Sequence, residues 1–284
     1  MQRTWKWSGI HTFFTDAEPE IFAKRCMEAG FAGVEATHAK LEPFSIKELE
    51  TLGASYRALG VDIPTFHFRF LPEDDVSSFY ESIRKNATET VIREMERVVA
   101  LGVKIGILHP AICRYGVETE GIDGFLRSLG KSLQKILPAA EKFGFTIALE
   151  NMTPSPDKRF CSIPKHFERV KKEFSHPNLG YCLDTGHALM SMHENAHEFF
   201  SVMGDRLIAY HIQDNPGDRD LHLAPGRGRV DWKNIFRTMA EKKFSGTACI
   251  EANPFNFGPQ YPEESWRIMV EETNALVEKM LQNP

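Results

Sequence analysis

Short apolar runs alternate with longer amphipathic segments along the whole chain. An uninterrupted apolar run is typical of a parallel strand that is buried on both faces of its sheet. Polar residues that follow directly after such strands lie at the edge of the sheet, where they are free to bind or react. The pattern predicts strands at residues 7–14, 33–36, 63–68 and 103–109, and four later strands that end at Glu150, Asp184, His211 and Glu251.

The amphipathic segments predict helices at residues 19–29, 45–59, 76–101, 123–143, 164–174, 194–203, 231–242 and 263–281. Strict alternation of strands and helices indicates a parallel sheet with helical crossovers. Eight such units close into a barrel, so we expect an α/β fold of the (β/α)8 TIM barrel type, with a single domain over residues 1–284. An open doubly wound sheet is disfavoured because no Gly-x-Gly-x-x-Gly motif follows the first strand.

Composition narrows the class of protein. A chain of 284 residues with 42% apolar content suits one barrel, which needs about 250 residues. The net charge of −5 and the lack of a basic tail argue against a nucleic-acid partner. The five scattered cysteines form no Cys-x-x-Cys pair, which fits a reducing compartment. Because no apolar stretch suits a signal peptide or a membrane helix, we expect a cytoplasmic protein without membrane contact; a homo-oligomer remains open.

Four of the strand ends carry residues that bind metal ions or transfer protons. Three carboxylates and one imidazole form a mostly oxygen donor set, which suits Mn, Mg, Co or Zn. Such a concentration of negative charge is costly without a cation. Each acid taken alone would more often cap a helix or pair with a lysine, but the equivalent placement of all four favours one divalent-metal site. The expected ligands are Glu150, Asp184, His211 and Glu251.

Three motifs lie at or after these strand ends: Asp-Thr-Gly-His at residues 184–187, His-Ile-Gln-Asp-Asn at 211–215, and Pro-Gly-x-Gly-x-x-Asp-Trp at 225–232. With the strand ends, they resemble the xylose-isomerase-like barrel superfamily of sugar-phosphate isomerases and epimerases. The resemblance implies the same four metal ligands, with Glu150 and Glu251 also acting as the catalytic acid/base pair. It further implies substrate-binding roles for His187 and for an arginine after the seventh strand, where Arg219 is the best candidate.

The implied function is a divalent-metal-dependent isomerase or epimerase acting on a small sugar or sugar phosphate. A metal that chelates a carbonyl oxygen and the neighbouring hydroxyl acidifies the intervening C–H and stabilises an enediolate. Two glutamates on opposite sides of that carbon would remove a proton from one face and return it to the other. Three other histidines, His67, His109 and His222, would orient metal ligands and substrate hydroxyls.

Other functions share these residues. The wider set also resembles, by residue type, the three-zinc site of the endonuclease IV family, which cleaves phosphodiesters; one ion favours the isomerase and three favour the nuclease. Against the nuclease, the segment after His67 does not resemble that family's DNA-contacting loop. An inosose-type dehydratase and a metal-binding barrel without catalysis are further alternatives. His11 and Glu35 end the first two strands and would either line the pocket or serve the structure. The wider set comprises His67, His109, Glu150, Asp184, His187, His211, Asp220, His222 and Glu251.

Overall fold

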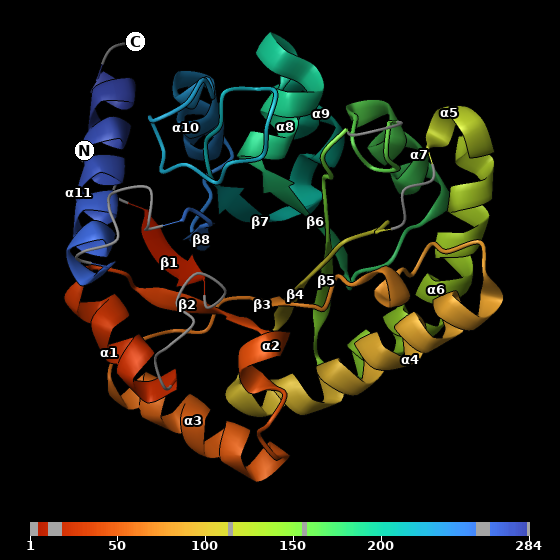
Figure 1. Ribbon diagram of the computed structural model, residues 1–284, viewed down its shortest axis with the longest axis horizontal. Coiled ribbons are helices and arrows are strands. Elements are labelled where there is room, and N and C mark those ends of the chain that lie inside the picture. Colours follow the sequence, from red (N-terminus) through yellow and green to blue (C-terminus); the bar gives the residue numbers. More distant parts are fainter. Residues whose placement is uncertain (1–4, 11–18, 113–115, 155–157, 254–261, 283–284) are drawn as a thin grey trace.

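The computed structural model describes residues 5–10, 19–112, 116–154, 158–253 and 262–282. Within these ranges, eight parallel strands form a closed barrel in which each strand pairs with its neighbours in sequence (Figure 1). The pairing of β8 with β1 completes the ring. The predicted TIM barrel is therefore confirmed. The strands are β1 (Lys6–Ile10), β2 (Gly33–Thr37), β3 (Phe66–His67), β4 (Ile105–Leu108), β5 (Thr146–Glu150), β6 (Leu179–Asp184), β7 (Leu207–Ile212) and β8 (Thr247–Ile250).

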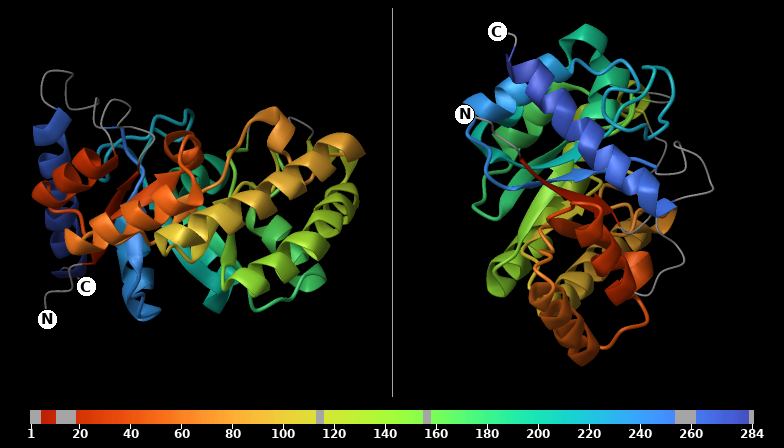
Figure 2. Two further views of the ribbon diagram at one scale, coloured as in Figure 1. Left: turned by 90° about the horizontal axis from the view of Figure 1, so that it is seen from below. Right: turned by 90° about the vertical axis from the view of Figure 1, so that its left-hand side faces the viewer.

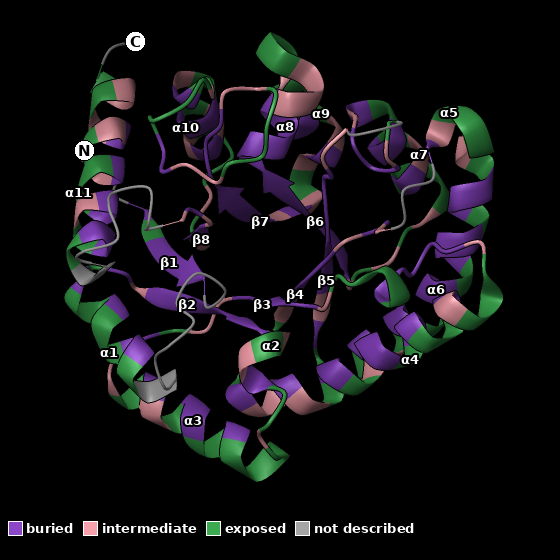
Figure 3. Cartoon of the chain, in the orientation of Figure 1, coloured by how far each residue is buried: buried purple, intermediate pink, exposed green. Residues whose placement is uncertain are grey.

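A layer of helices surrounds the barrel, and buried residues concentrate on the strands and on the helix faces turned toward them (Figure 3). The last helix, α11, contacts both α10 and α1, so it closes this outer layer (Figure 2). In the described residues, none of the helices combines the length and the apolarity needed to cross a membrane. The outer helices are α1 (Pro19–Glu28), α3 (Ile46–Ala58), α4 (Glu81–Val98), α6 (Ile122–Phe143), α7 (Pro164–Glu173), α9 (Glu198–Met203), α10 (Trp232–Glu241) and α11 (Pro262–Gln282).

Short helices also occur in the loops. The helix α8 was not predicted; it starts directly after β6 because the Asp184 side chain caps its first turn by accepting a hydrogen bond from the His187 amide at 2.7 Å. The predicted helix at residues 76–101 begins later, at Glu81, since the Asp75 carboxylate accepts bonds from the Ser77 amide and hydroxyl and favours a turn. The short helices are α2 (His38–Leu41), α5 (Val117–Glu120) and α8 (Thr185–Met192), and the 3-10 turns are η2 (Pro72–Asp74), η3 (Val99–Leu101), η4 (His193–Asn195) and η5 (Gly204–Arg206).

Apolar side chains fill the barrel interior below its C-terminal end. Ile107, Ala148, Cys182 and Ala209 form one buried cluster, with one residue from each of β4 to β7. Successive side chains of a strand point to opposite faces, so the residue two positions further along each strand also points inward. By this rule the side chains two positions further along also face the barrel axis; these residues are His109, Glu150, Asp184 and His211.

Candidate metal centre

The structure brings the four predicted ligands together at the C-terminal end of the barrel. Glu150 and Asp184 are the last residues of β5 and β6, His211 lies in β7, and Glu251 follows β8 directly. One potential ligand atom from each residue lies within 4.8 Å of those from the other three, and the backbone alternation described above explains this convergence. The side chains of Glu150, Asp184 and His211 are buried.

The ends of β5 and β6 are fastened to each other by Asn151. Its side chain accepts a hydrogen bond from the Asp184 amide at 2.7 Å and donates one to the Asp184 carbonyl oxygen at 2.9 Å. Asp184 also accepts a hydrogen bond through its side chain: Gln213 Nε2 donates to Asp184 Oδ1 (3.2 Å) and to Asp220 Oδ1 (3.0 Å). A Cβ on Gly186 would lie 2.2 Å from Gln213 Oε1, so glycine is required for this approach. The glycine of the Asp-Thr-Gly-His motif is therefore needed for packing against Gln213, whereas the aspartate and the histidine supply the chemical groups.

Charge in the cluster is tightly balanced. His211 Nδ1 lies 3.0 Å from Glu150 Oε1 and 2.7 Å from Glu251 Oε2. Burial acts to raise the pKa of Glu150, but His211 and His109 outweigh it and hold that pKa well below its usual range. Burial raises the pKa of Asp184 to about 7, and His187 offsets this effect only in part. Protons on the histidines therefore balance the carboxylates, and a divalent cation would replace those protons on binding.

Three histidines present their Nε2 atoms to carboxylates. The Nδ1 atoms of His67, His187 and His222 each lie within hydrogen-bond distance of a backbone carbonyl oxygen, at 2.8, 2.8 and 2.9 Å respectively. Donation from Nδ1–H to a carbonyl fixes the orientation of each ring, and Nε2 would become a metal ligand on losing its proton. In addition, Oε2 of Glu150 and Oε2 of Glu251 are buried without a hydrogen-bond donor in suitable geometry among the described residues. Both observations fit a metal ion.

Two further groups flank the central one. His67 and His109 approach Glu150 Oε2 with their Nε2 atoms, at 3.6 and 3.1 Å. On the other side, His187 Nε2 and His222 Nε2 lie 3.2 and 3.4 Å from Asp220 Oδ2. The potential ligand atoms within each group also lie within 4.8 Å of one another. All nine residues of the wider set are thus gathered in adjoining groups.

The predicted substrate contact Arg219 is not part of this gathering in the described structure. Its side chain is 70% exposed, and its Nε lies 3.7 Å from Asp218 Oδ1. The sequence indicates Arg219 only as an arginine in the loop after β7, and the structure directs its side chain to the surface. His11 lies outside the described residues.

Glu35 has a clearer place than the sequence indicated. It is fully buried, and its Oε1 and Oε2 lie 3.1 and 3.2 Å from His211 Nε2. Thr65 donates a hydrogen bond to Glu35 Oε2 at 2.6 Å. A carboxylate on the outer nitrogen of a ligating histidine fixes its orientation, so Glu35 turns His211 Nδ1 toward Glu150 and Glu251. The prediction that Glu35 ends the second strand is wrong, because Glu35 is the middle residue of β2; its position in the sequence does not reveal this partner.

We expect Glu35→Leu to weaken divalent-metal binding by about 10–100-fold, because the orientation of His211 is lost. Glu35→Gln keeps an oxygen that can accept from His211 Nε2–H, so its loss should be much smaller. Metal affinity is measured by competition with a chromophoric chelator, with the melting temperature (Tm) of each apoprotein recorded in parallel. Equal metal affinity in Glu35→Leu and in the wild type would show that Glu35 has no positioning role.

One family model matches most of the chain. The model of the family described as "Xylose isomerase-like TIM barrel" matches residues 23–279. The chain belongs to this family. The resemblance to this family that the motifs indicated is thus confirmed, and so is the barrel fold that it implied.

Curated relatives differ in what their names state. The uncharacterised protein MJ1614 of Methanocaldococcus jannaschii is 32% identical over 180 residues, which cover 62% of this chain and 65% of that protein. Fructoselysine 3-epimerase of Escherichia coli O157:H7 is 21% identical over 79% of this chain and 82% of its own. A probable endonuclease 4 of Mesoplasma florum is 24% identical over 61% of both chains. The relatives thus include a protein named as a 3-epimerase and one named as a probable endonuclease.

Solved structures share the fold. D-psicose 3-epimerase from Clostridium cellulolyticum H10, solved with D-tagatose, has a TM-score of 0.81 at 18% identity and covers 96% of this chain and 99% of its own. The IolI protein, solved with a bound zinc atom, has a TM-score of 0.78 at 19% identity and covers 96% and 98%. At these identities the likeness shows the barrel fold.

Proposed function

We propose that the protein is a divalent-metal-dependent sugar isomerase or epimerase that moves a proton at a carbon beside a carbonyl group. The observation that carries this proposal is the placement of Glu150 and Glu251 around one histidine nitrogen, His211 Nδ1, at 3.0 and 2.7 Å. The two carboxylates come from the ends of β5 and β8, three strands apart in the ring, so they enter the site from different directions. The relatives named as 3-epimerases support the same chemistry.

The residues divide the work. Glu150, Asp184, His211 and Glu251 would hold one ion of Mn, Zn, Co or Mg. Such an ion polarises a carbonyl oxygen and acidifies the adjacent C–H. One glutamate then removes the proton from one face of that carbon, and the other returns a proton to the opposite face. If the proton returns to the neighbouring carbon instead, the product is the aldose–ketose isomer.

His187 is suited to hold a substrate oxygen. Burial acts to lower its pKa, but the carboxylates of Asp184 and Asp220 outweigh that effect and raise the pKa to about 10. Its ring is fixed through the Asn151 carbonyl oxygen, so the Nε2–H points to the side of the cluster where Asp220 lies. His187 Nε2 already lies 3.2 Å from Asp220 Oδ2, so a sugar hydroxyl would bind at the edge of this pair, where it would share the Nε2–H and donate to the carboxylate.

The test of the proposed function is proton exchange with solvent. The protein, loaded separately with each of the four ions, is incubated in D₂O with a panel of unmodified ketoses, and deuterium at the carbons beside the carbonyl is followed by NMR. Incorporation at one such carbon, with formation of its epimer, supports the proposal. Turnover of a sugar with no deuterium uptake at all would overturn the two-glutamate chemistry.

A three-metal phosphodiester hydrolase is a second candidate, and one observation favours it. The two flanking groups, His67–His109–Glu150 and His187–Asp220–His222, each have the composition and the spacing of a metal site. A relative named as a probable endonuclease 4 is consistent with this alternative. Metal analysis separates the two candidates: one ion per chain supports the isomerase. Three zinc ions together with rapid cleavage of an oligonucleotide at an abasic site would replace it with the nuclease.

A further inference from the structure

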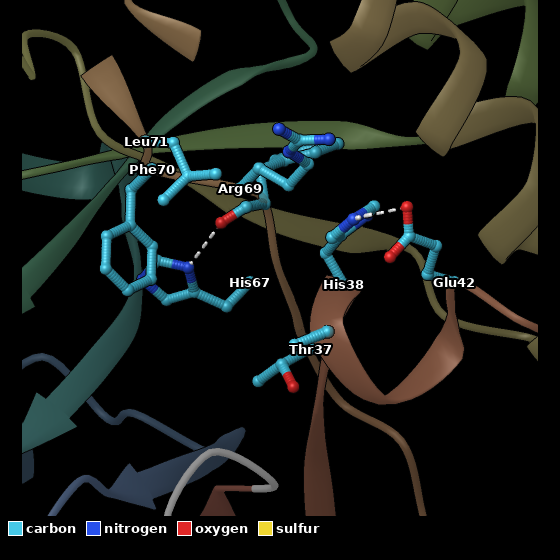
Figure 4. A pocket seen from close by; sticks show the side chains of 9 residues that line it. Thr37, His38, Glu42, His67, Arg69, Phe70 and Leu71 are labelled. Carbon is cyan, nitrogen blue, oxygen red and sulfur yellow. Dashed lines mark hydrogen bonds and ion pairs between the residues drawn. The ribbon is translucent and has the colours of Figure 1, made fainter. Parts of the chain in front are cut away.

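A cavity of about 410 Å³ lies beside the candidate metal centre, between two loops at the C-terminal end of the barrel. The end of β2 and the helix α2 form one wall, and residues 67–71, which include the end of β3, form the other (Figure 4). This volume lies within the range of about 300–1,000 Å³ that is usual for small-molecule sites. Of the nine residues of the wider set, His67 is the one among those described that lines it, so the cavity lies beside the metal cluster and shares this residue with it.

The cavity adjoins the reactive groups through His67. The Phe70 ring lies 5.2 Å from the His67 ring and 5.0 Å from the His109 ring, centroid to centroid. Both histidines reach Glu150 Oε2 with their Nε2 atoms. A substrate whose carbonyl end lies at the cluster can therefore extend past His67 into the cavity.

The apolar part of the cavity is exposed. Phe70 and Leu71 are 50% and 49% exposed, although both are large hydrophobic residues in the loop that follows β3. Their side chains lie together on the β3 side of the cavity, opposite α2 (Figure 4). An aromatic face with an adjoining aliphatic side chain binds apolar groups and the C–H faces of sugars, because both gain by leaving water.

The charged groups around the cavity are already paired. Arg69 Nε lies 3.1 Å from Asp74 Oδ2, and its guanidinium also lies 3.5 Å from Glu73 Oε1. Across the cavity, His38 lies 2.9 Å from a buried Glu94 oxygen and 3.8 Å from Glu42 Oε1 (Figure 4). Because the lining cations are matched by carboxylates, the described part of the cavity has little excess positive charge for a phosphate group.

One polar group of the cavity has no partner. Thr37, at the end of β2, is 5% exposed, and its hydroxyl forms no hydrogen bond among the described residues. The residue occupies the N-cap position of α2, where a threonine hydroxyl commonly bonds to the helix, yet it makes no capping bond. Its oxygen is buried in this conformation, so a ligand hydroxyl would reach it by rotation of the Thr37 side chain toward the cavity, which would also remove the cost of the missing bond.

We propose that this cavity binds the far end of the substrate, and that the substrate is an uncharged, unphosphorylated sugar derivative with an apolar substituent remote from its carbonyl group. The substituent packs on Phe70 and Leu71, and Thr37 bonds a hydroxyl of the sugar chain. This inference rests on the proposed sugar chemistry at the metal cluster, and it deepens that proposal by naming the class of substrate.

The first test compares three probes: D-fructose, D-fructose 6-phosphate and 6-O-benzyl-D-fructose. Calorimetry gives the affinity of the metal-loaded protein for each, and deuterium uptake in D₂O gives the reaction separately. We expect the benzyl derivative to bind at least about tenfold more tightly than D-fructose, since burying a few methylene-sized groups is worth that much. Equal affinity of these two probes, or preferential binding of the phosphate, would overturn the inference.

Variants locate the effect. Leu71→Asn, which has nearly the same size, should reduce the preference for the benzyl derivative about tenfold. The matched control is Ile46→Asn, because Ile46 is equally exposed at 47% but lies at the start of α3 outside the cavity. An unchanged preference in Leu71→Asn, or an equal change in Ile46→Asn, would contradict a role for this wall.

Thr37→Val separates a ligand-binding role of the hydroxyl from a role in stabilising the fold, because sugar affinity and Tm are measured on the same variant. It removes a hydroxyl that bonds to no described residue, so the Tm should stay the same or rise. Affinity for the sugar probes should still fall about two- to tenfold, as for one lost hydrogen bond. A lower Tm with unchanged affinity would assign the hydroxyl to the fold instead. If the benzyl derivative binds more tightly than D-fructose but no probe exchanges deuterium, the cavity inference stands and the proposed reaction fails. If a probe exchanges deuterium but the benzyl derivative binds no more tightly, the proposed reaction stands and the cavity inference fails.

Discussion

Replacing Glu150 by glutamine is expected to reduce deuterium exchange at the reacting carbon by about 10²–10⁴-fold, and Glu251→Gln should do the same. Glutamine keeps one neutral oxygen near His211 Nδ1 but cannot accept the proton. Metal affinity should fall less than the exchange rate, because Asp184, His211 and the remaining glutamate still converge. The deuterium exchange rates of the two variants and of the wild type are measured by NMR in D₂O at saturating metal.

Each of these variants removes a carboxylate, so a control for charge is needed. Glu173→Gln removes an exposed carboxylate at the end of α7 that pairs with Arg169 and belongs to none of the ligand groups, and it should leave the exchange rate unchanged. If the two glutamates act on opposite faces of the carbon, the Glu150 and Glu251 variants will also differ in which epimer still exchanges. Full activity in both variants would refute the two-glutamate mechanism.

Removing the metal with a chelator is expected to abolish exchange and to lower the Tm. A ligand that binds only the folded state adds RT ln(1 + [L]/Kd) to the free energy of unfolding, which is about 4.1 kcal/mol at a free-metal concentration of 1,000 times Kd. For a chain of this size, that energy corresponds to a Tm shift of roughly 8–16 °C. Differential scanning calorimetry with and without chelator measures the shift.

Restoring Mn, Zn, Co and Mg one at a time should recover both Tm and exchange, and the order of recovery identifies the metal. Asp184→Asn is the matched variant. It keeps the size of the side chain but removes one ligand charge, so its Tm should respond much less to the chelator. A wild-type Tm and exchange rate that do not change on chelation would rule out the metal-dependent reaction.

The Pro-Gly-x-Gly-x-x-Asp-Trp motif shows how a sequence signal and a tertiary contact are connected. The buried Asp214 carboxylate accepts bonds from the Gly226 amide at 3.0 Å and from Trp232 Nε1 at 2.8 Å on one oxygen, and from the Val230 amide at 3.0 Å on the other. A Cβ on Gly228 would lie 2.3 Å from the same carboxylate. The spacing of the motif therefore allows its residues to bond to one carboxylate, that of Asp214, and these bonds stabilise the loop that contains Asp220 and His222. The sequence displayed this spacing but not the acid at its centre.

The sequence by itself determined the barrel and the positions of its strand ends. Apolar runs and helical periodicity are local properties, and the alternation of side chains along a strand then carries Glu150, Asp184 and His211 to the interior. The four candidate ligands could be chosen for the same reason, since the ends of all strands of a closed parallel barrel meet at one face.

Only the tertiary structure decided how these groups face one another. The contact of Glu35 with His211 joins residues that are 176 positions apart, and the orientation of the His187 ring depends on the carbonyl oxygen of Asn151, which follows β5. The exposure of Arg219 and the cavity beside Thr37 depend on loop conformation, which has no periodicity to read. Local patterns fix which residues arrive at the end of the barrel, while side-chain orientation is set by contacts between distant segments.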